Sequence, residues 1–574
     1  MREVVRFFTF LITIVILILS VTACDDGGEV HYLYELDENG DAVITEARYP
    51  WMHLSPFGKA TIPEYIDGYK VVAIADEAFA YSYIYEVTVP GTVRYIGARA
   101  FKGSVLDKIY IPSSVEYIGD GAFCGCGFSD PWMAITLDTA NPYYKFENRN
   151  LYTADMSTLV YFGDLDKSSF EVPEGVTRIG GYAFADADNL ISITLPEGLL
   201  EIGECAFWNT GLAQITIPST VVKIENRAIN GMVAEIALPR DLEQIGERVL
   251  TAGKVVTLDP ENKNFKIEND ALLSMDGSVF YQYIGNGESS YSIPSGVEKI
   301  SAYAFGRKSN DMIVPGTKID EIIIPESVRE IGDNAFYYCM WLDSVTIPEG
   351  VVKLGKTCFY SCISLETVYI PSTLDFSLTD GGIQAVFCGV DNAPERIEIS
   401  PGHAEYKSVD GVVYSQDGKR LILCPGGRED SNYKIENGTE VIAERAFYDC
   451  KKIKGVDIPE SVLIIEKEAF YNAVGLDDIV IPDSVVEIQE YAFYSCSLKS
   501  AYIGSAVEVI GESAFGNFFD NKWTMKVEFA NPAGWRCVKD GKGREMNETI
   551  LSVGYLAGKR INYKYSGYRW EKIA

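Results

Sequence analysis

The chain has 574 residues, with 82 acidic and 50 basic side chains and a formal net charge of −32. This balance argues against a nucleic-acid-binding protein, because affinity for phosphate backbones comes mainly from clustered cations. Hydrophobic residues make up 47% and charged residues 23%, which predicts a packed body rather than a disordered chain.

Residues 1–23 have the pattern of a secretory signal. Two arginines precede an apolar run at residues 7–21, which is short for a membrane span of about 20 residues but typical of a signal peptide. The run ends in Val-Thr-Ala-Cys, which resembles a bacterial lipobox, and the resemblance implies that Cys24 is lipidated and anchors the mature chain outside the cytoplasm. The alternative is an ordinary signal in which Cys24 is incidental.

The remaining chain divides into a repeat array and two flanking segments. We expect residues 24–60 to form a tether and an N-terminal cap, since the turn-like Asn39-Gly40 lies beside the apolar pair Val43-Ile44. Residues 61–516 carry the repeats, and residues 517–574 break the pattern and are rich in aromatic residues. A solenoid must cover the apolar ends of its core, so we interpret this last segment as a C-terminal cap.

One repeat of about 23 residues recurs fifteen times in the array. Its clearest copy begins at Leu342 and runs through Val345-Thr346-Ile347-Pro348 to Phe359. Alternation of apolar and polar residues predicts a strand, the proline ends it, and Ala-Phe predicts a short helical turn that places a ring in the core. The position of this proline in the fifteen copies, which we call the proline column, is occupied by Pro63, Pro90, Pro112, Pro173, Pro196, Pro218, Pro239, Pro294, Pro325, Pro348, Pro371, Glu436, Pro459, Pro482 and Gly504.

No single copy can bury its own apolar face, so the copies must stack about 4.8 Å apart. The pattern, with proline after the strand and Ala-Phe-x-x-Cys closing the coil, resembles the leucine-rich repeats of BspA-like bacterial surface proteins over residues 61–516. The resemblance implies an α/β fold leaning to β: a right-handed solenoid with a parallel sheet and about fifteen coils. The chain lacks the Asn that leucine-rich repeats usually carry after the strand.

Three segments interrupt the repeat, near residues 134–164, 254–286 and 395–427. Each contains an aromatic residue followed by Lys, then a pair of apolar residues, and then an Asp. The turns Asp276-Gly277 and Asp417-Gly418 favour tight hairpins. We therefore predict three inserted two-stranded β-ribbons, which follow the third, seventh and eleventh coils. Each ribbon either covers a seam between duplicated blocks or serves as a contact arm.

The cysteine and histidine residues give little support for a catalytic or metal-binding site. Of 12 cysteines, five share one column of the repeat, three residues after the phenylalanine: Cys126, Cys339, Cys362, Cys450 and Cys496. Other coils place Ala, Ser or Thr there, which favours a small core residue over a metal ligand, although disulfides between stacked coils remain open. The three histidines, His31, His53 and His403, have no motif around them, so we expect no enzyme, no metal and no cofactor.

The outward face of the predicted sheet is the remaining candidate for a functional site. On each strand, the central side chain points outward, and the stacked coils align these side chains into one stripe. The expected binding stripe comprises Thr88, Tyr110, Thr194, Thr216, Thr346, Tyr369, Asp457 and Tyr502. Tyrosine is favoured at interfaces, but Thr and Tyr also simply suit exposed strands.

These features predict a lipid-anchored cell-surface protein that binds another macromolecule through its solenoid. The BspA-like resemblance implies adhesion, with an extracellular protein or a cell-surface or matrix macromolecule as partner, the membrane reached through the lipid, and no nucleic acid. The alternatives are a structural envelope protein, or a carbohydrate-binding or glycan-active protein.

Overall fold

A computed structural model describes residues 30–48, 58–126, 134–229, 233–250, 255–285, 289–306, 319–387, 394–516, 525–539, 542–545 and 569–572. The predicted signal peptide and Cys24 lie outside these residues. The chain forms two compact units, residues 1–143 and 144–574, and each has its own sheets.

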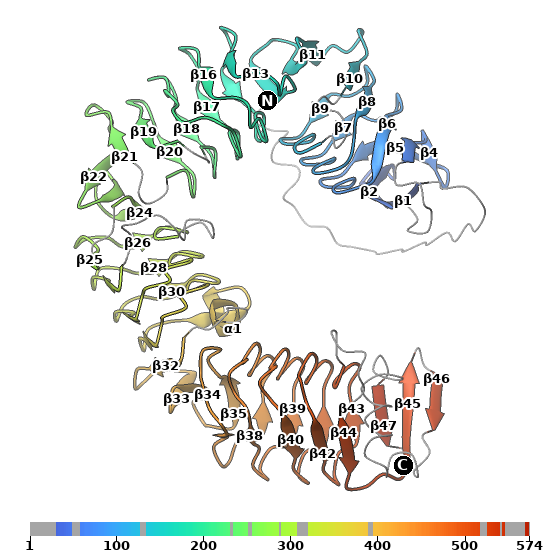
Figure 1. The fold of residues 1–574 in the computed structure, drawn as a ribbon, viewed down its shortest axis with the longest axis vertical. Helices are drawn as coiled ribbons and strands as arrows, with labels where there is room; N and C mark the ends of the chain where they lie inside the picture. The colour runs from blue at the N-terminus through green and yellow to red at the C-terminus, as the bar shows by residue number, and fades with distance from the viewer. Residues whose placement is uncertain are drawn as a thin grey trace. The chain divides into compact units, whose positions relative to one another are not determined.

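Each coil contributes two strands to two separate parallel ladders (Figure 1). In one coil, β29 (Ser344–Thr346) lies in the first ladder and β30 (Lys353–Leu354) in the second. The first strand alternates between buried and exposed side chains, because it covers the core with one face only. The predicted solenoid of stacked parallel strands is confirmed, but it has about 19 turns where the repeat predicts about fifteen. Helix is almost absent: the described residues contain α1 (Gly382–Phe387) and the 3-10 turn η2 (Phe376–Leu378).

In the first unit, one sheet contains an N-terminal hairpin followed by the second ladder. Strands β1 and β2 pair antiparallel, and β2 then pairs parallel with β5, so the hairpin continues the ladder of the first coil. This sheet contains β1 (His31–Leu36), β2 (Ala42–Arg48), β4 (Tyr65–Ile66), β5 (Tyr69–Ile74), β7 (Tyr95–Ile96) and β9 (Tyr117–Ile118). The first ladder contains β3 (Gly58–Thr61), β6 (Ile84–Thr88), β8 (Lys108–Ile111) and β10 (Ala134–Leu137).

In the second unit, the second ladder runs as three sheets, each of which begins with three antiparallel strands. The first has β11 (Tyr144–Glu147), β12 (Asn150–Thr153), β13 (Thr158–Phe162), β15 (Arg178–Ile179), β17 (Glu201–Ile202), β18 (Lys223–Ile224) and β20 (Gln244–Ile245). The second has β22 (Phe265–Glu268), β23 (Ala271–Ser274), β24 (Val279–Tyr283), β26 (Lys299–Ile300), β28 (Glu330–Ile331) and β30. The third has β33 (Tyr406–Val409), β34 (Val412–Ser415), β35 (Arg420–Leu423), β37 (Val441–Ile442), β39 (Ile464–Ile465), β41 (Glu487–Ile488) and β43 (Val509–Ile510), and ends in β47 (Arg569–Lys572), β45 (Trp535–Lys539) and β46 (Lys542–Glu545).

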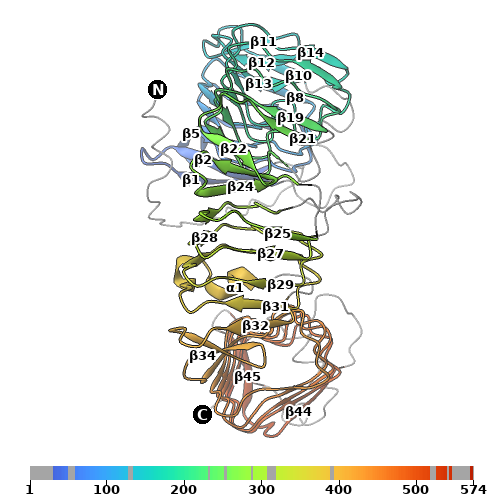
Figure 2. The same ribbon diagram turned by 90° about the vertical axis from the view of Figure 1, so that its left-hand side faces the viewer.

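The first ladder of this unit is also divided into sheets, and Figure 2 shows β25, β27, β29 and β31 side by side. The two-stranded sheets are β14 (Ser169–Glu171) with β16 (Ser192–Thr194), β19 (Glu235–Leu238) with β21 (Val255–Leu258), and β36 (Tyr433–Lys434) with β38 (Val456–Asp457). The larger ones are β25 (Ser290–Ser292), β27 (Glu321–Ile323), β29, β31 (Thr367–Ile370) and β32 (Arg396–Ile399), and then β40 (Asp478–Ile481), β42 (Ser500–Ile503) and β44 (Lys526–Phe529).

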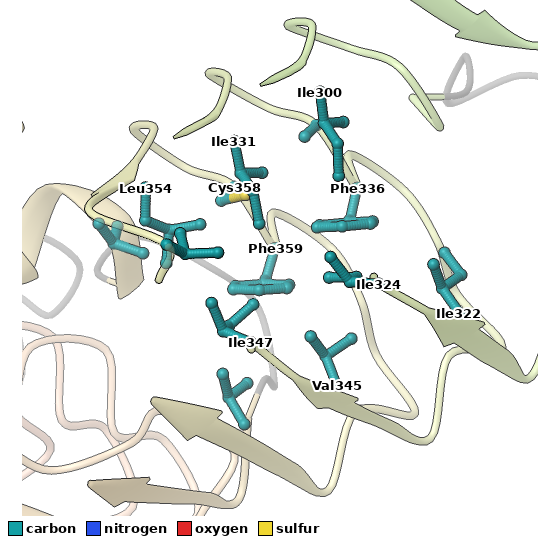
Figure 3. Close-up of a cluster of buried hydrophobic side chains, with 14 of the residues drawn as sticks. Ile300, Ile322, Ile324, Ile331, Phe336, Val345, Ile347, Leu354, Cys358 and Phe359 are labelled. Carbon is teal, nitrogen blue, oxygen red and sulfur yellow. The ribbon is translucent and has the colours of Figure 1, made fainter. Parts of the chain in front are cut away.

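The core between the ladders is a column of stacked phenyl rings flanked by aliphatic side chains (Figure 3). The rings of Phe336 and Phe359 lie 5.4 Å apart with an interplanar angle of 3°. Ile331 and Leu354 approach them from the second ladder, and Val345 from the first. A buried Phe contributes about 1.5–3 kcal/mol, so the ring column predicted from the repeat is a main source of stability.

The Ala-Phe segment is not the helical turn that the sequence predicts. Glu77 and Tyr81, which flank one copy, have φ angles of 57° and 55°, in the left-handed region. The amide of Phe79 donates to the carbonyl of Ala100 in the next coil at 2.7 Å. A helical turn would use such N–H groups internally, whereas here they bond along the solenoid and form a third hydrogen-bonded column.

The three predicted ribbons are turns of the solenoid rather than insertions, and each has three antiparallel strands instead of two. In the second ribbon, β21 pairs parallel with β19 of the preceding coil, while β24 pairs parallel with β26 of the following coil. The hairpin β22–β23 lies before β24 in the same sheet. Because β20 ends one sheet and β22 begins the next, the second ladder has a seam at the ribbon.

Candidate interaction surface

The predicted stripe residues occupy the outward positions of the first ladder. Thr88 of β6 faces Tyr110 of β8 in the first unit, and Thr346 of β29 faces Tyr369 of β31 in the second. All eight predicted side chains are at least partly exposed: Thr88, Tyr110, Thr194, Thr216, Thr346, Tyr369, Asp457 and Tyr502. The alternation of the strands therefore gives the expected orientation.

The structure does not join these residues into one stripe. Thr194 of β16 lies in a two-stranded sheet opposite Glu171, Asp457 lies opposite Lys434 in another, and Tyr502 lies in a third opposite Val480. Thr216 lies outside any strand. The prediction of a continuous row was wrong in this respect, because the first ladder is interrupted at every ribbon and also between β16 and β19 and between β38 and β40.

The five-stranded sheet from β25 to β32 offers the longest uninterrupted row. Its outward column runs through Ile323, Thr346, Tyr369 and Glu398. Ile323 is 49% exposed and Tyr369 is 47% exposed, so two large apolar side chains face solvent two strands apart. At the end of the row, Arg396 forms ion pairs with Glu398 at 2.9 Å and with Asp410 at 3.0 Å. The row is therefore apolar at its centre and charged at its edge.

Tyr110 is more constrained than its counterparts in the second unit. Its hydroxyl donates to the Asp138 carboxylate at 3.4 Å. Burial, and then the nearby Asp138 charge, raise the pKa of the Tyr110 hydroxyl. This side chain remains a neutral hydrogen-bond donor at physiological pH.

A second aromatic column was not recognised from the sequence. The residue after the core phenylalanine is tyrosine in two groups of adjacent coils, Tyr337 with Tyr360 and Tyr448 with Tyr471 and Tyr494. Their rings stack at 5.0–5.4 Å, and all five are partly exposed. The Phe-Tyr pair in each of these coils was the available signal, but it does not show on which side of the turn the tyrosine ring lies.

The cysteine column is part of the core. The Cys362 thiol donates to the carbonyl of Phe336 at 3.1 Å, and Cys496 bonds in the same way to Phe470 at 2.9 Å. Burial raises the pKa of Cys126 and Cys496 to about 12 and that of Cys362 well above its ordinary value. Cys126, Cys358, Cys362, Cys424 and Cys496 are free thiols. The thiol is thus a small buried side chain that donates to the carbonyl of the preceding coil.

The described histidines, and the other described residues that could form a catalytic or metal site, do not lie together. His31 lies in β1, and His403 is a buried residue at the third ribbon, while His53 lies outside the described residues. Among the described residues no three His, Cys, Asp or Glu side chains gather in a way that could hold a metal ion. In that same part of the chain, no helix has the length and apolar character needed to cross a membrane.

Two parallel ladders, a buried phenylalanine column and a repeat of about 23 residues define a leucine-rich repeat solenoid. The chain belongs to the family of the BspA type leucine rich repeat region, whose model matches residues 72–166, 156–277, 315–377 and 430–522, more than half of the chain. A search of the curated proteins found no match.

Solved structures that are similar to this chain include leucine-rich repeat proteins. A leucine-rich repeat protein from Eubacterium ventriosum is 20% identical, with 80% of this chain and 91% of that chain covered and a TM-score of 0.30. A leucine rich cell surface protein from Faecalibacterium prausnitzii is 17% identical, with 88% and 96% covered and a TM-score of 0.26. A leucine-rich repeat protein from Bacteroides ovatus is 20% identical, with 88% and 99% covered and a TM-score of 0.22.

Proposed function

We propose that this chain is a cell-surface adhesion protein, anchored through a lipid on Cys24, that binds an extracellular protein or matrix macromolecule through the first ladder. The observation that carries the proposal is the outward row of the β25–β32 sheet. A monomeric protein seldom aligns large apolar side chains on a rigid exposed sheet, and such a patch with a charged rim is typical of an interaction site.

The row also has the physical properties that binding requires. Its strands are held in register by the ladder, so Ile323 and Tyr369 lose little conformational freedom when a partner covers them. Tyrosine adds a large contact area and a hydroxyl that stays hydrogen-bonded in the complex. A protein partner fits this chemistry better than a neutral glycan, since Ile323 offers a sugar no hydrogen bond.

A double substitution tests the proposal. Ile323→Ser with Tyr369→Ala removes the apolar centre of the row, while Val352→Ser with Val486→Ser removes side chains that are 41% and 39% exposed beside the second ladder. We expect the first pair to weaken attachment of the purified protein to cells or matrix by about tenfold or more, and the second pair to leave it unchanged. Equal attachment by both folded variants would refute binding through the first ladder.

Two other outcomes would favour a different function. If neither the wild type nor any variant attaches to cells or matrix, the result would support a structural envelope protein. Turnover of a polysaccharide that one carboxylate substitution abolishes would support a glycan-active enzyme.

The anchor is tested separately with Cys24→Ala. The expected result is loss of lipid labelling, with the chain released to the medium or retaining its signal. Labelling that persists in this variant would exclude Cys24 as the lipidated residue.

A further inference from the structure

One side-chain position lies between each ribbon and the coil before it. It comes three residues ahead of the first ribbon strand and is occupied in turn by Asn141, Asn262 and His403. The Asn262 amide nitrogen donates to the carbonyls of Pro239 at 3.0 Å and Leu242 at 3.1 Å. Asn141 donates to two carbonyls of its own preceding coil in the same way. The asparagine amide therefore links a ribbon to the coil that precedes it.

His403 makes only half of these bonds. It is 2% exposed, and its Nδ1 accepts the backbone N–H groups of Glu405 and Tyr406 at 3.2 and 3.3 Å. The Asn262 oxygen accepts two N–H groups at the start of the second ribbon in the same manner. The His403 Nε2, however, is buried and has no hydrogen-bond partner in the part of the chain that the structure describes. The third ribbon thus lacks the side-chain link that the asparagines provide.

The groups around His403 come from the preceding coil and from the ribbon. Asp375 and the carbonyl of Leu374 face it from the coil, and Glu405 and the Tyr406 ring, at 5.5 Å, from the ribbon. Burial lowers the pKa of His403, although the Leu374 carbonyl and the two carboxylates oppose the shift. Burial raises the pKa of the Tyr406 hydroxyl, which therefore carries no charge near neutral pH. The closed ribbon holds a neutral imidazole beside two carboxylates.

Protonation of His403 removes the bonds that hold the start of the ribbon. In the charged ring both nitrogens carry hydrogen and neither can accept, so the N–H groups of Glu405 and Tyr406 lose their acceptor. A buried charge and buried donors without a partner are both unfavourable. The charged ring is therefore stable only where it reaches water. An asparagine amide does not titrate, so the same change of pH leaves the bonds of Asn141 and Asn262 intact.

The third ribbon also holds the outer edge of β32, the last strand of the β25–β32 sheet. The inner edge of β32 pairs with β31. On the outer edge, the N–H of Ile397 donates to the carbonyl of Gly411 at 3.0 Å. The N–H of Ile399 donates to the Ser408 hydroxyl at 3.0 Å. Ser408 and Gly411 belong to the β33–β34 hairpin, which begins three residues after His403, so release of the ribbon frees this edge.

We propose that the third ribbon is a pH-sensitive latch: in acid, His403 releases the start of the ribbon, and the outer edge of β32 becomes free. The row through Ile323, Thr346, Tyr369 and Glu398 then loses the support of its last strand. Attachment through this row weakens in acid, because its side chains are no longer held in a fixed register. Only this last step rests on the proposed function; release of the ribbon depends on His403 and its contacts alone.

Hydrogen exchange of the whole purified chain, followed by mass spectrometry at pH 7 and pH 5, tests the latch. Rates are divided by those of the unfolded chain at each pH, which removes the intrinsic pH dependence of exchange. Because the released ring regains its ordinary pKa, protection in residues 396–411 is expected to fall about 5- to 20-fold at pH 5. Protection in residues 255–270, the matching segment of the second ribbon, is expected to stay constant.

Two substitutions exchange the key residue between the ribbons. His403→Asn is expected to abolish the difference between pH 7 and pH 5 in residues 396–411. Asn262→His is expected to create such a difference in residues 255–270. The first variant carries the residue that the other two ribbons have at this position, so it is compatible with folding and decides the question even if the second variant does not fold.

Two results would overturn the latch: an equal loss of protection in the wild type and in His403→Asn, or full protection of the wild-type ribbon at pH 5. Attachment to cells or matrix is compared at the same two pH values in the wild type and in His403→Asn. If the wild type releases its ribbon at pH 5 and still attaches as firmly as the variant, the latch stands and binding through the row is rejected.

Discussion

Leu272 and Leu273 are neighbours in β23, yet their side chains pack into two different hydrophobic cores. Leu272 belongs to the core of the preceding coils and Leu273 to that of the following coils. Val413 and Val412 of the third ribbon divide in the same way between two cores. Successive side chains of a strand point to opposite faces, and both faces of β23 are covered. The middle strand of a ribbon therefore separates two hydrophobic cores and contributes one face to each.

This arrangement predicts that the two leucines protect different segments. Both are fully buried, so Leu→Ala at either position is expected to cost about 2–5 kcal/mol. Leu272→Ala should speed hydrogen exchange mainly in residues 152–250, and Leu273→Ala mainly in residues 289–387. Exchange measured by mass spectrometry checks this, and identical exchange patterns in the two variants would show that the ribbon does not separate the cores.

His403 predicts a pH dependence at the third ribbon. Its Nδ1 accepts the backbone N–H groups of Glu405 and Tyr406 at 3.2 and 3.3 Å, which only the neutral ring can do. Burial lowers the pKa of His403 below 6.5, although Glu405 and Asp375 oppose the shift. The unfolded chain then binds the proton more readily, so this contribution to stability is complete above pH 6.5 and decreases as the pH falls toward the folded-state pKa.

His403→Asn is the matched variant for this effect. Asn262 occupies the same place in the second ribbon, where its Oδ1 accepts the N–H groups of Asn264 and Phe265 at 2.9 and 2.8 Å. Urea unfolding at pH 7 and pH 5 should show a smaller loss of stability in the variant than in the wild type. An equal loss in both would mean that carboxylates alone account for the acid sensitivity.

The buried cysteines are predicted to be unreactive in the folded protein. Because burial raises the pKa of Cys126 and Cys496 to about 12, almost no thiolate is present near pH 8 and alkylation requires unfolding. Mass spectrometry after iodoacetamide treatment should find these residues unmodified in native protein and modified in denaturant. Rapid native modification of Cys496 would contradict its place in the core.

The left-handed residues of the Ala-Phe turns offer a route to greater stability. Ser513 has a φ of 52°, which costs a non-glycine residue about 1–2 kcal/mol, so Ser513→Gly is expected to raise the free energy of unfolding by about 0.5–1 kcal/mol. Ser505→Gly, in the same coil but outside the left-handed region, should lower it. Chemical denaturation compares the two, and a destabilised Ser513→Gly would show that the turn is not strained.

Several features could be predicted from the sequence because they recur from coil to coil. The proline and phenylalanine columns predicted the stacking, since a side chain that recurs at one position of each coil must meet its equivalents. The cysteine column was interpreted correctly for the same reason, because positions that also accept Ala, Ser or Thr require small side chains. The ribbons were located by their shared pattern, but their third strand was missed, since its short apolar sequence resembles the second strand of an ordinary coil.

The amino-acid sequence by itself determined the period, the inward face and the places where the repeat is interrupted, because each depends on local alternation of apolar and polar residues. Only the tertiary structure decided which ladder each ribbon strand joins and where the ladders break. It alone placed the third ribbon along the outer edge of β32, where the N–H groups of Ile397 and Ile399 donate to it, because hydrogen bonds of the backbone leave no pattern in the side chains.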